Sequence, residues 1–124
     1  MTNEDREAVW RAILKQQAER FSNPKTEDDQ WGVVVTHGTD TLLQTARYLQ
    51  TKLDYYSSND DVRICVTGAM RPERFSNSDA PINVGMAVAS VQLAPAPRTV
   101  YVCMQGVVKS ANTMQRDATT GRFS

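Results

Sequence analysis

A strand that runs directly into a polar turn constrains this chain more than any other feature. The run Gly-Val-Val-Val at 32–35 is typical of a buried strand, and residues 36–41 then carry hydroxyls, an imidazole, a carboxylate and a glycine. A second polar turn, at 67–72, follows the next apolar strand. Parallel strands end on the same edge of a sheet, where open α/β folds bind ligands. The pattern therefore predicts a site built from both turns.

Apolar strands alternate with amphipathic helices over most of the chain. We expect helices from 2 to about 20, from 39–41 to the polar run at 57–60, and from 81 to the prolines at 95 and 97. We expect strands at 32–35, 62–66 and 99–104, whereas the tail at 105–124 is polar and has no clear period. This order favours the α/β class: a three-layer αβα fold with a mostly parallel sheet.

Helix caps are predicted at two places. Thr2 with Asp5 has the spacing of a capping pair at the start of the first helix. Thr41 with Gln44 has the same spacing at the start of the second. Both pairs are candidates for satisfying the free amides that begin a helix.

Length and charge limit the class of the protein and its partners. The 124 residues fit one domain. The 14 basic and 14 acidic residues leave no net charge, which argues against nucleic-acid and anionic-membrane partners. No apolar run reaches the ~18 residues of a transmembrane helix, and the polar N-terminus does not resemble a signal peptide. We therefore expect a cytoplasmic protein.

The sequence indicates neither a metal site nor a disulfide. Both cysteines, Cys65 and Cys103, fall inside expected strands, so we expect buried, reduced thiols. The chain has one histidine and no Cys-x-x-Cys spacing, so we expect no bound metal.

The first turn has a structural and a functional interpretation. A threonine or an aspartate before a helix usually caps it, and this is the commoner role for residues such as Thr39 and Asp40. His37 alone is typical of a hydrogen-bonded loop residue. The functional interpretation rests on the density of groups, because a hydroxyl beside a carboxylate at a helix N-terminus suits nucleophilic attack and anion binding. Such a hydroxyl needs a base or a cation, and Lys109 and Arg116 in the tail are candidates.

Both turns resemble one known family. The run VVTHGTDTL at 34–42 strongly resembles the threonine–aspartate motif of the bacterial-type L-asparaginase/glutaminase family. The runs VTGAMRP at 66–72 and SDAPIN at 78–83 resemble the next block of that family, in the same order. The resemblance covers nearly the whole chain but only a middle portion of the usual family chain.

The resemblance implies an activity and a set of roles. The family hydrolyses the side-chain amide of L-asparagine, sometimes of glutamine, to the acid and ammonia through a covalent acyl-enzyme and without a cofactor. By resemblance, Thr39 is one of the two threonines of the family, and Asp40 holds the α-amino group of the substrate. Gly38 and the carbonyl of Ala69 border the substrate, and Arg116 stands at the position of the triad lysine.

Three departures from the family pattern bear on activity. The strand with the nucleophilic threonine and its paired glycines is absent, and no two of the glycines here are adjacent. Arg116 replaces lysine, and arginine keeps its charge at ordinary pH, so it does not shuttle a proton. Ala80 replaces a glycine, which lowers the stability by about 1 kcal/mol if that position needs a positive φ. The family's C-terminal domain is absent as well.

These departures leave several interpretations open. We expect a single truncated asparaginase-like domain at 1–124 with impaired or no hydrolysis, which uses Thr39, Asp40 and Arg116 and binds L-asparagine or L-aspartate. The alternatives are a non-catalytic amino-acid-binding or interaction module and a fragment of a longer asparaginase. Losing the first strand exposes an apolar strand at the sheet edge, so we expect a homodimer or a higher homo-oligomer.

Overall fold

The computed structural model describes residues 1–21, 31–55, 62–70, 77–93 and 98–124. The elements in chain order are α1 (Asn3–Phe21), β1 (Trp31–Thr36), the 3₁₀ turn η2 (Thr39–Thr41), α2 (Leu42–Tyr55), β2 (Val62–Thr67), α3 (Ala80–Leu93), β3 (Val100–Met104) and β4 (Val107–Ser110). The helices and the first three strands match the expected ones. The expected ends of the second and third helices, at the polar run 57–60 and at the prolines 95 and 97, lie outside the described residues.

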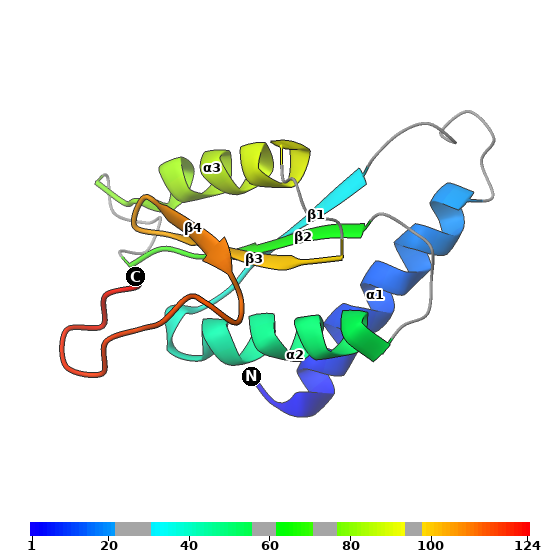
Figure 1. The fold of residues 1–124 in the computed structure, drawn as a ribbon, viewed down its shortest axis with the longest axis horizontal. Coiled ribbons are helices and arrows are strands. Elements are labelled where there is room, and N and C mark those ends of the chain that lie inside the picture. The colour runs from blue at the N-terminus through cyan, green and yellow to red at the C-terminus, as the bar shows by residue number, and fades with distance from the viewer. Residues whose placement is uncertain (22–30, 56–61, 71–76, 94–97) are drawn as a thin grey trace.

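The strands form one sheet in the order β1-β2-β3-β4. The pairs β1–β2 and β2–β3 are parallel, and β4 is antiparallel to β3. Helix α3 covers one face of the sheet, and α1 and α2 cover the other (Figure 1). The prediction of a three-layer αβα fold with a mostly parallel sheet is confirmed.

The core lies on both faces of β2, because every residue of that strand is buried. The larger cluster lies between the sheet and the α1–α2 layer and includes Trp10, Leu49 and Ile64. The smaller cluster lies under α3 and contains both cysteines. Both thiols are free and buried, as expected, and burial raises the pKa of the Cys65 thiol to about 12. Neither cysteine is therefore a reactive thiolate at neutral pH.

A tight turn returns the chain along β3, and the sequence analysis did not predict it. Gln105 and Gly106 have φ values of 53° and 75°, so both central residues of the turn adopt the left-handed conformation typical of a two-residue hairpin. β4 follows as a short edge strand whose side chains are all at least partly exposed. Such a strand lacks the continuous apolar run that identified the other strands.

The two predicted caps have different outcomes. At α1, the Thr2 amide donates to Asp5 Oδ2 at 2.9 Å and the Asp5 amide donates to Thr2 Oγ1 at 3.2 Å, so this capping pair is confirmed. The prediction of a Thr41–Gln44 capping pair was wrong. The N-cap residue of η2 is Gly38, and no side chain caps this turn. The chain enters α2 through a 3₁₀ turn, which replaces a capping box.

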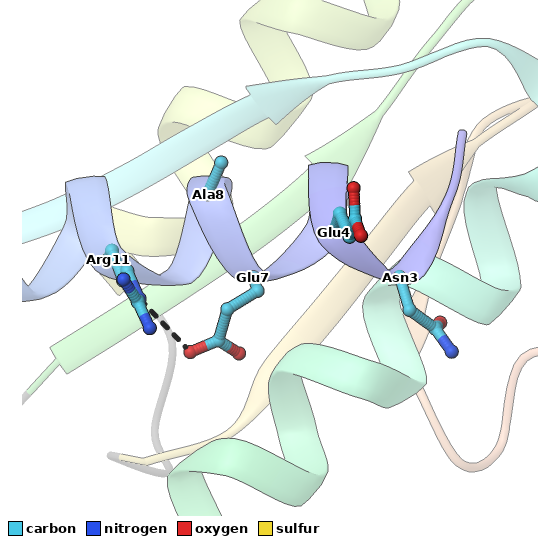
Figure 2. A pocket seen from close by; sticks show the side chains of 5 residues that line it. All are labelled: Asn3, Glu4, Glu7, Ala8 and Arg11. Carbon is cyan, nitrogen blue, oxygen red and sulfur yellow. Dashed lines mark hydrogen bonds and ion pairs between the residues drawn. The ribbon is translucent and has the colours of Figure 1, made fainter.

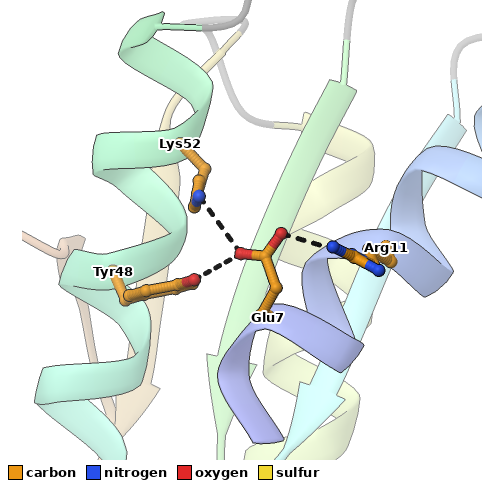
Figure 3. Close-up of polar contacts among 4 residues, drawn as sticks. All are labelled: Glu7, Arg11, Tyr48 and Lys52. Atoms are coloured by element: carbon orange, nitrogen blue, oxygen red, sulfur yellow. Dashed lines mark hydrogen bonds and ion pairs between the residues drawn. The ribbon is translucent and has the colours of Figure 1, made fainter. Parts of the chain in front are cut away.

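Glu7 joins α1 and α2 on the face of the sheet opposite α3. Glu7 on α1 accepts a short hydrogen bond from the Tyr48 hydroxyl and pairs with Lys52, both on α2 (Figure 3). Arg11, one helical turn further along α1, lies 3.4 Å from the other oxygen of Glu7. The Tyr48 and Lys52 hydrogen bonds lower the pKa of Glu7 below its ordinary value of 4.5. The ionised carboxylate therefore links α1 to α2.

This link makes the stability depend on pH. We expect Glu7→Gln to lower the free energy of unfolding at neutral pH, because it removes the charge that Lys52 and Tyr48 bind. A lowered pKa contributes stability above the ordinary value of 4.5 and loses it as the pH falls through the folded-state value. The difference between wild type and Glu7→Gln should therefore be smaller at an acidic pH below 4.5 than at neutral pH. Urea unfolding at both pH values checks this. Glu4→Gln, on the same helix, is the control and should cause little change at either pH.

Candidate functional site

The turns after β1 and β2 meet at the carboxyl edge of the sheet, as the sequence predicts. The His37 amide donates to the Thr67 carbonyl at 2.8 Å, which extends the β1–β2 pairing by one residue and holds the turns together. A cavity of about 410 Å³ opens between them and the start of α3. It is lined by Thr36, His37, Gly38, Gly68, Ala69, Ala80 and Val84. Two of the predicted substrate-binding residues, Gly38 and Ala69, therefore border one cavity.

The imidazole of His37 is engaged in structural contacts. Its Nδ1 lies 2.6 Å from the Gly38 carbonyl, and a carbonyl only accepts, so Nδ1 carries the proton. Nε2 then accepts from the Thr45 hydroxyl at 2.8 Å, and Thr45 Oγ1 accepts from Arg6 Nε at 3.0 Å. This chain of bonds ties the first turn to α2 and α1. His37 is a hydrogen-bonded loop residue, as the simpler interpretation expected.

The second turn is held by the start of α3. Asp79 Oδ2 accepts from the Met70 amide and from Asn83 Nδ2, each at 3.0 Å. Asn83 Nδ2 also donates to the Gly68 carbonyl at 2.9 Å, and Asn83 is buried. The sequence analysis assigned no role to this pair. One signal was available in the sequence: Asn83 stands in an otherwise apolar helix. A side-chain amide that is buried there needs hydrogen-bond partners.

Arg116 reaches the first turn from the C-terminal tail. Its Nη1 donates to the Thr39 carbonyl at 2.8 Å and lies 3.7 Å from Asp40 Oδ1. Its Nε donates to the Gly121 carbonyl at 3.0 Å, and its guanidinium lies 5.1 Å from the centre of the Phe123 ring. The structure thus brings Thr39, Asp40 and Arg116 together, although they are far apart in sequence.

The ion pair in this cluster is open to solvent. The Asp40 side chain is 98% exposed and that of Arg116 is 25% exposed, so their ion pair is screened by solvent and worth little by itself. Within the described residues, Arg116 Nη2 has no hydrogen-bond acceptor, so its N–H groups remain for a ligand. The cluster presents a carboxylate and a guanidinium side by side, which suits a zwitterion.

In the part of the chain that the structure describes, no hydrogen bond joins the Thr39 hydroxyl to a base, and the contact of Thr39 with Arg116 is made by its carbonyl. The alternative base, Lys109, is an exposed residue of β4 paired with Val102 of β3, and no hydrogen bond joins it to Thr39. No group of three or more potential ligands among His, Cys, Asp and Glu could hold a metal in the described ranges. The arrangement suits binding of a charged ligand better than activation of a hydroxyl.

A second hollow, of about 410 Å³, lies along α1 and is lined by Asn3, Glu4, Glu7, Ala8 and Arg11 (Figure 2). Its lining comes from a single helix, whereas ligand sites usually combine polar groups from several elements. Glu7 and Arg11 within it are already paired.

None of the helices that the structure describes is long and apolar enough to cross a membrane.

Comparisons with known proteins agree with the motifs. Residues 3–123 match the family model for the N-terminal part of asparaginase. L-asparaginase 2 of Bacillus subtilis is 33% identical over 112 residues, which cover 87% of this chain and 28% of that protein. L-asparaginase 2 of Escherichia coli is 34% identical over 90 residues, covering 72% of this chain and 24% of that protein. The chain therefore spans about a quarter of these relatives.

The fold agrees as well. The crystal structure of a probable cytoplasmic L-asparaginase from Campylobacter jejuni matches with a TM-score of 0.66 and 31% sequence identity, covering 94% of this chain and 34% of that one. Sequence motifs, family model and fold lead to the same result. This chain belongs to the asparaginase family and corresponds to part of its N-terminal domain.

Proposed function

We propose that this chain is an L-asparaginase-type amidohydrolase domain that binds L-asparagine or L-aspartate and, by itself, has impaired or no hydrolytic activity. Residues 1–124 act as one truncated domain. The observation that carries the proposal is the position of Arg116, with Nη1 2.8 Å from the Thr39 carbonyl and 3.7 Å from Asp40 Oδ1. Arg116 thereby occupies the neighbourhood of the threonine–aspartate motif.

Each residue has a proposed role in binding. The exposed carboxylate of Asp40 receives the α-ammonium of the amino acid, and the free N–H groups of Arg116 receive a carboxylate. Gly38 and the Ala69 carbonyl border the side-chain amide, which is consistent with their lining one cavity. Similar proteins include L-asparaginases and a glutaminase-asparaginase, which supports this ligand class.

Turnover is limited by the chemistry of the cluster. No hydrogen bond joins the Thr39 hydroxyl to a base among the described residues, and Arg116 does not accept a proton at ordinary pH. Members of a catalytic triad act as a unit, so losing some of them costs orders of magnitude in rate. Little catalysis by Thr39 alone is therefore expected.

Two other functions remain as alternatives. A non-catalytic amino-acid-binding or interaction module is favoured by the arginine in place of lysine. A part of a longer asparaginase is favoured by length, because the chain spans 28% of the Bacillus subtilis relative. A cytoplasmic location stays a prediction: the Campylobacter jejuni neighbour is described as probably cytoplasmic, whereas the Haemophilus influenzae relative is described as periplasmic.

The test combines turnover and binding. Ammonia release from L-asparagine and L-glutamine should be at least about a thousandfold below that of a complete asparaginase assayed in parallel. L-aspartate should raise the melting temperature of the wild type, and Asp40→Asn should abolish this shift. Asp54→Asn, a substitution on α2 away from both turns, is the matched control and should keep it.

The outcomes separate the three interpretations. Full turnover by the wild type would refute the proposed loss of activity. If Thr39→Ala then abolished this turnover, Thr39 would be the nucleophile. No melting shift with either amino acid would refute the binding site. Turnover that appears only when a segment carrying the absent strand is co-expressed would favour the part of a longer enzyme.

A further inference from the structure

Two residues at the start of α3 hold both peptide groups that flank Ala69. The Gly68 carbonyl, which belongs to the peptide group before Ala69, accepts from Asn83 Nδ2 at 2.9 Å. The Met70 amide, which belongs to the peptide group after Ala69, donates to Asp79 Oδ2 at 3.0 Å. Because each peptide group is planar, holding both of them restrains the two backbone dihedral angles of Ala69.

The bond from Met70 to Asp79 also sets the direction of the Ala69 carbonyl. The C=O and the N–H of a trans peptide group point in opposite directions, and none of the described peptide bonds is cis. The Met70 N–H points at the carboxylate of Asp79. The Ala69 C=O, which belongs to the same peptide group, therefore points away from that carboxylate.

The Ala69 carbonyl has no protein donor in the ranges that the structure describes. Ala69 is half-buried and borders the cavity between the two turns. A half-buried carbonyl without a donor is stabilised by an N–H group of a ligand. It disfavours a carboxylate at the same place, because a carbonyl and a carboxylate are both acceptors.

Asp79 and Asn83 are themselves held firmly. Asn83 Nδ2 donates to Asp79 Oδ2 at 3.0 Å as well as to the Gly68 carbonyl, so both N–H groups of this amide are used. Asn83 is only 1% exposed. A buried polar network whose members are satisfied is rigid. The position of α3 therefore sets the position of the second turn.

We propose that Asp79 and Asn83 are positioning residues: they hold the Ala69 carbonyl toward the side-chain group of the bound amino acid and make the site select an amide over an acid. This inference rests on the proposed binding of L-asparagine or L-aspartate and adds a preference between the two. Both ligands carry the same α-ammonium and α-carboxylate groups, and they differ only at the end of the side chain.

The difference between the ligands matches the chemistry of the carbonyl. L-asparagine presents N–H donors to the Ala69 carbonyl, whereas L-aspartate presents a second acceptor. A site that is built to bind a polar group with a fixed partner rejects an analogue that lacks this group. The preference depends on a carbonyl that cannot turn away, and Asp79 and Asn83 prevent this rotation.

The first test measures the ratio of the two affinities. Isothermal titration calorimetry of the wild type at neutral pH should show L-asparagine bound at least about tenfold more tightly than L-aspartate. Asp79→Ala releases the Met70 amide and should lower this ratio at least about fivefold. A purely structural role would weaken both ligands alike and would leave the ratio unchanged.

Two further substitutions at the same place are matched controls. Asp79→Asn keeps an oxygen that accepts from the Met70 amide, so it should retain most of the ratio. Ser78→Ala removes the hydroxyl that accepts from the Ala80 amide at 3.1 Å, so it disturbs the start of α3 but leaves the two anchors of the second turn in place. Its ratio should stay within about twofold of the wild type.

The second anchor tests whether both residues act through one carbonyl. Asn83→Ala removes the donor to the Gly68 carbonyl and should lower the ratio in the same direction as Asp79→Ala. The double variant should show less than the product of the two single effects, because residues that act through a shared partner are not additive. Far-UV circular dichroism checks that each variant is folded.

The carbonyl can also be observed in the wild type, without any substitution. Backbone NMR of the isotopically labelled chain follows the carbonyl carbon of Ala69. L-asparagine should shift this resonance downfield, as a newly accepted hydrogen bond does, and L-aspartate should shift it less. This measurement tests the contact even if Asp79→Ala or Asn83→Ala fails to fold.

The outcomes distinguish this inference from the proposed function. If neither amino acid binds, the proposed binding site is refuted, and the inference with it. If both bind without a preference, or if Asp79→Ala leaves the ratio unchanged, only the inference is refuted. An equal loss of the ratio in Ser78→Ala would likewise refute it, as would an Ala69 carbonyl resonance that L-asparagine does not move.

Discussion

Gly68→Ala is expected to destabilise the protein by about 3 kcal/mol, because the new methyl group meets backbone that has no room to move. A Cβ at this position would lie 2.3 Å from the His37 carbonyl oxygen and 3.3 Å from Leu42 Cδ1. His37 is fixed by its amide bond to Thr67 at 2.8 Å. Relieving the clash therefore means breaking the contact between the two turns. Urea unfolding measures the loss.

The neighbouring turn supplies the control for this substitution. Nothing lies within 4 Å of a Cβ built on Gly38, and its φ of −67° is an ordinary one for alanine. Gly38→Ala should change the free energy of unfolding by no more than about 0.5 kcal/mol. Equal losses in the two variants would show that the turns are not in tight contact and would contradict the packing of the site.

Arg116→Lys is expected to destabilise the protein by about 2 kcal/mol, although it keeps the charge. A lysine ammonium cannot reproduce the fork that binds the Thr39 and Gly121 carbonyls together, nor the flat contact with the Phe123 ring. The tail would loosen from η2, and the stabilisation by L-aspartate should weaken at the same time. Thermal unfolding with and without L-aspartate measures both effects.

Arg122→Lys is the matched control for that experiment. Arg122 lies in the same tail and is exposed, so its substitution should stay within about 0.5 kcal/mol of the wild type. Arg116→Lys also introduces the residue type that the motif resemblance implies for this position. We expect it not to produce ammonia release, because no hydrogen bond joins the Thr39 hydroxyl to a base among the described residues. Turnover in this variant would show that Arg116 alone blocks catalysis.

Much of the fold could be predicted because it depends on local patterns. The strand β1 carries a continuous apolar run and β2 is apolar except for Arg63, and each is followed by a turn of polar and small residues, so their parallel arrangement and the shared edge followed from sequence. The Thr2–Asp5 cap was also predictable, since its partners are three residues apart. The hairpin at Gln105–Gly106 was missed because β4 is short and partly exposed.

The candidate site could be predicted only in part. The density of groups around Thr39 and Asp40 marked the first turn, and the motif resemblance pointed to Arg116. The supporting residues Thr45 and Asp79 carry no signal of their own, because their roles come from bonds to groups in other elements. Asn83 is marked only as an asparagine in an otherwise apolar helix, and the sequence does not show which groups it binds. The Thr41–Gln44 cap failed for a related reason: the 3₁₀ turn places Gly38 at the N-cap.

Hydrophobic periodicity and short motifs are local, so the layers, the two turns and the family could be predicted from the sequence. The contents of the site depend instead on contacts between distant parts of the chain. Arg116 lies 77 positions from Thr39 along the chain, and only the return of the tail past β4 brings its Nη1 to the Thr39 carbonyl. The bonds of Asp79 and Asn83 to the second turn likewise depend on the position of α3. Long-range hydrogen bonds set both features, and a linear pattern does not record them.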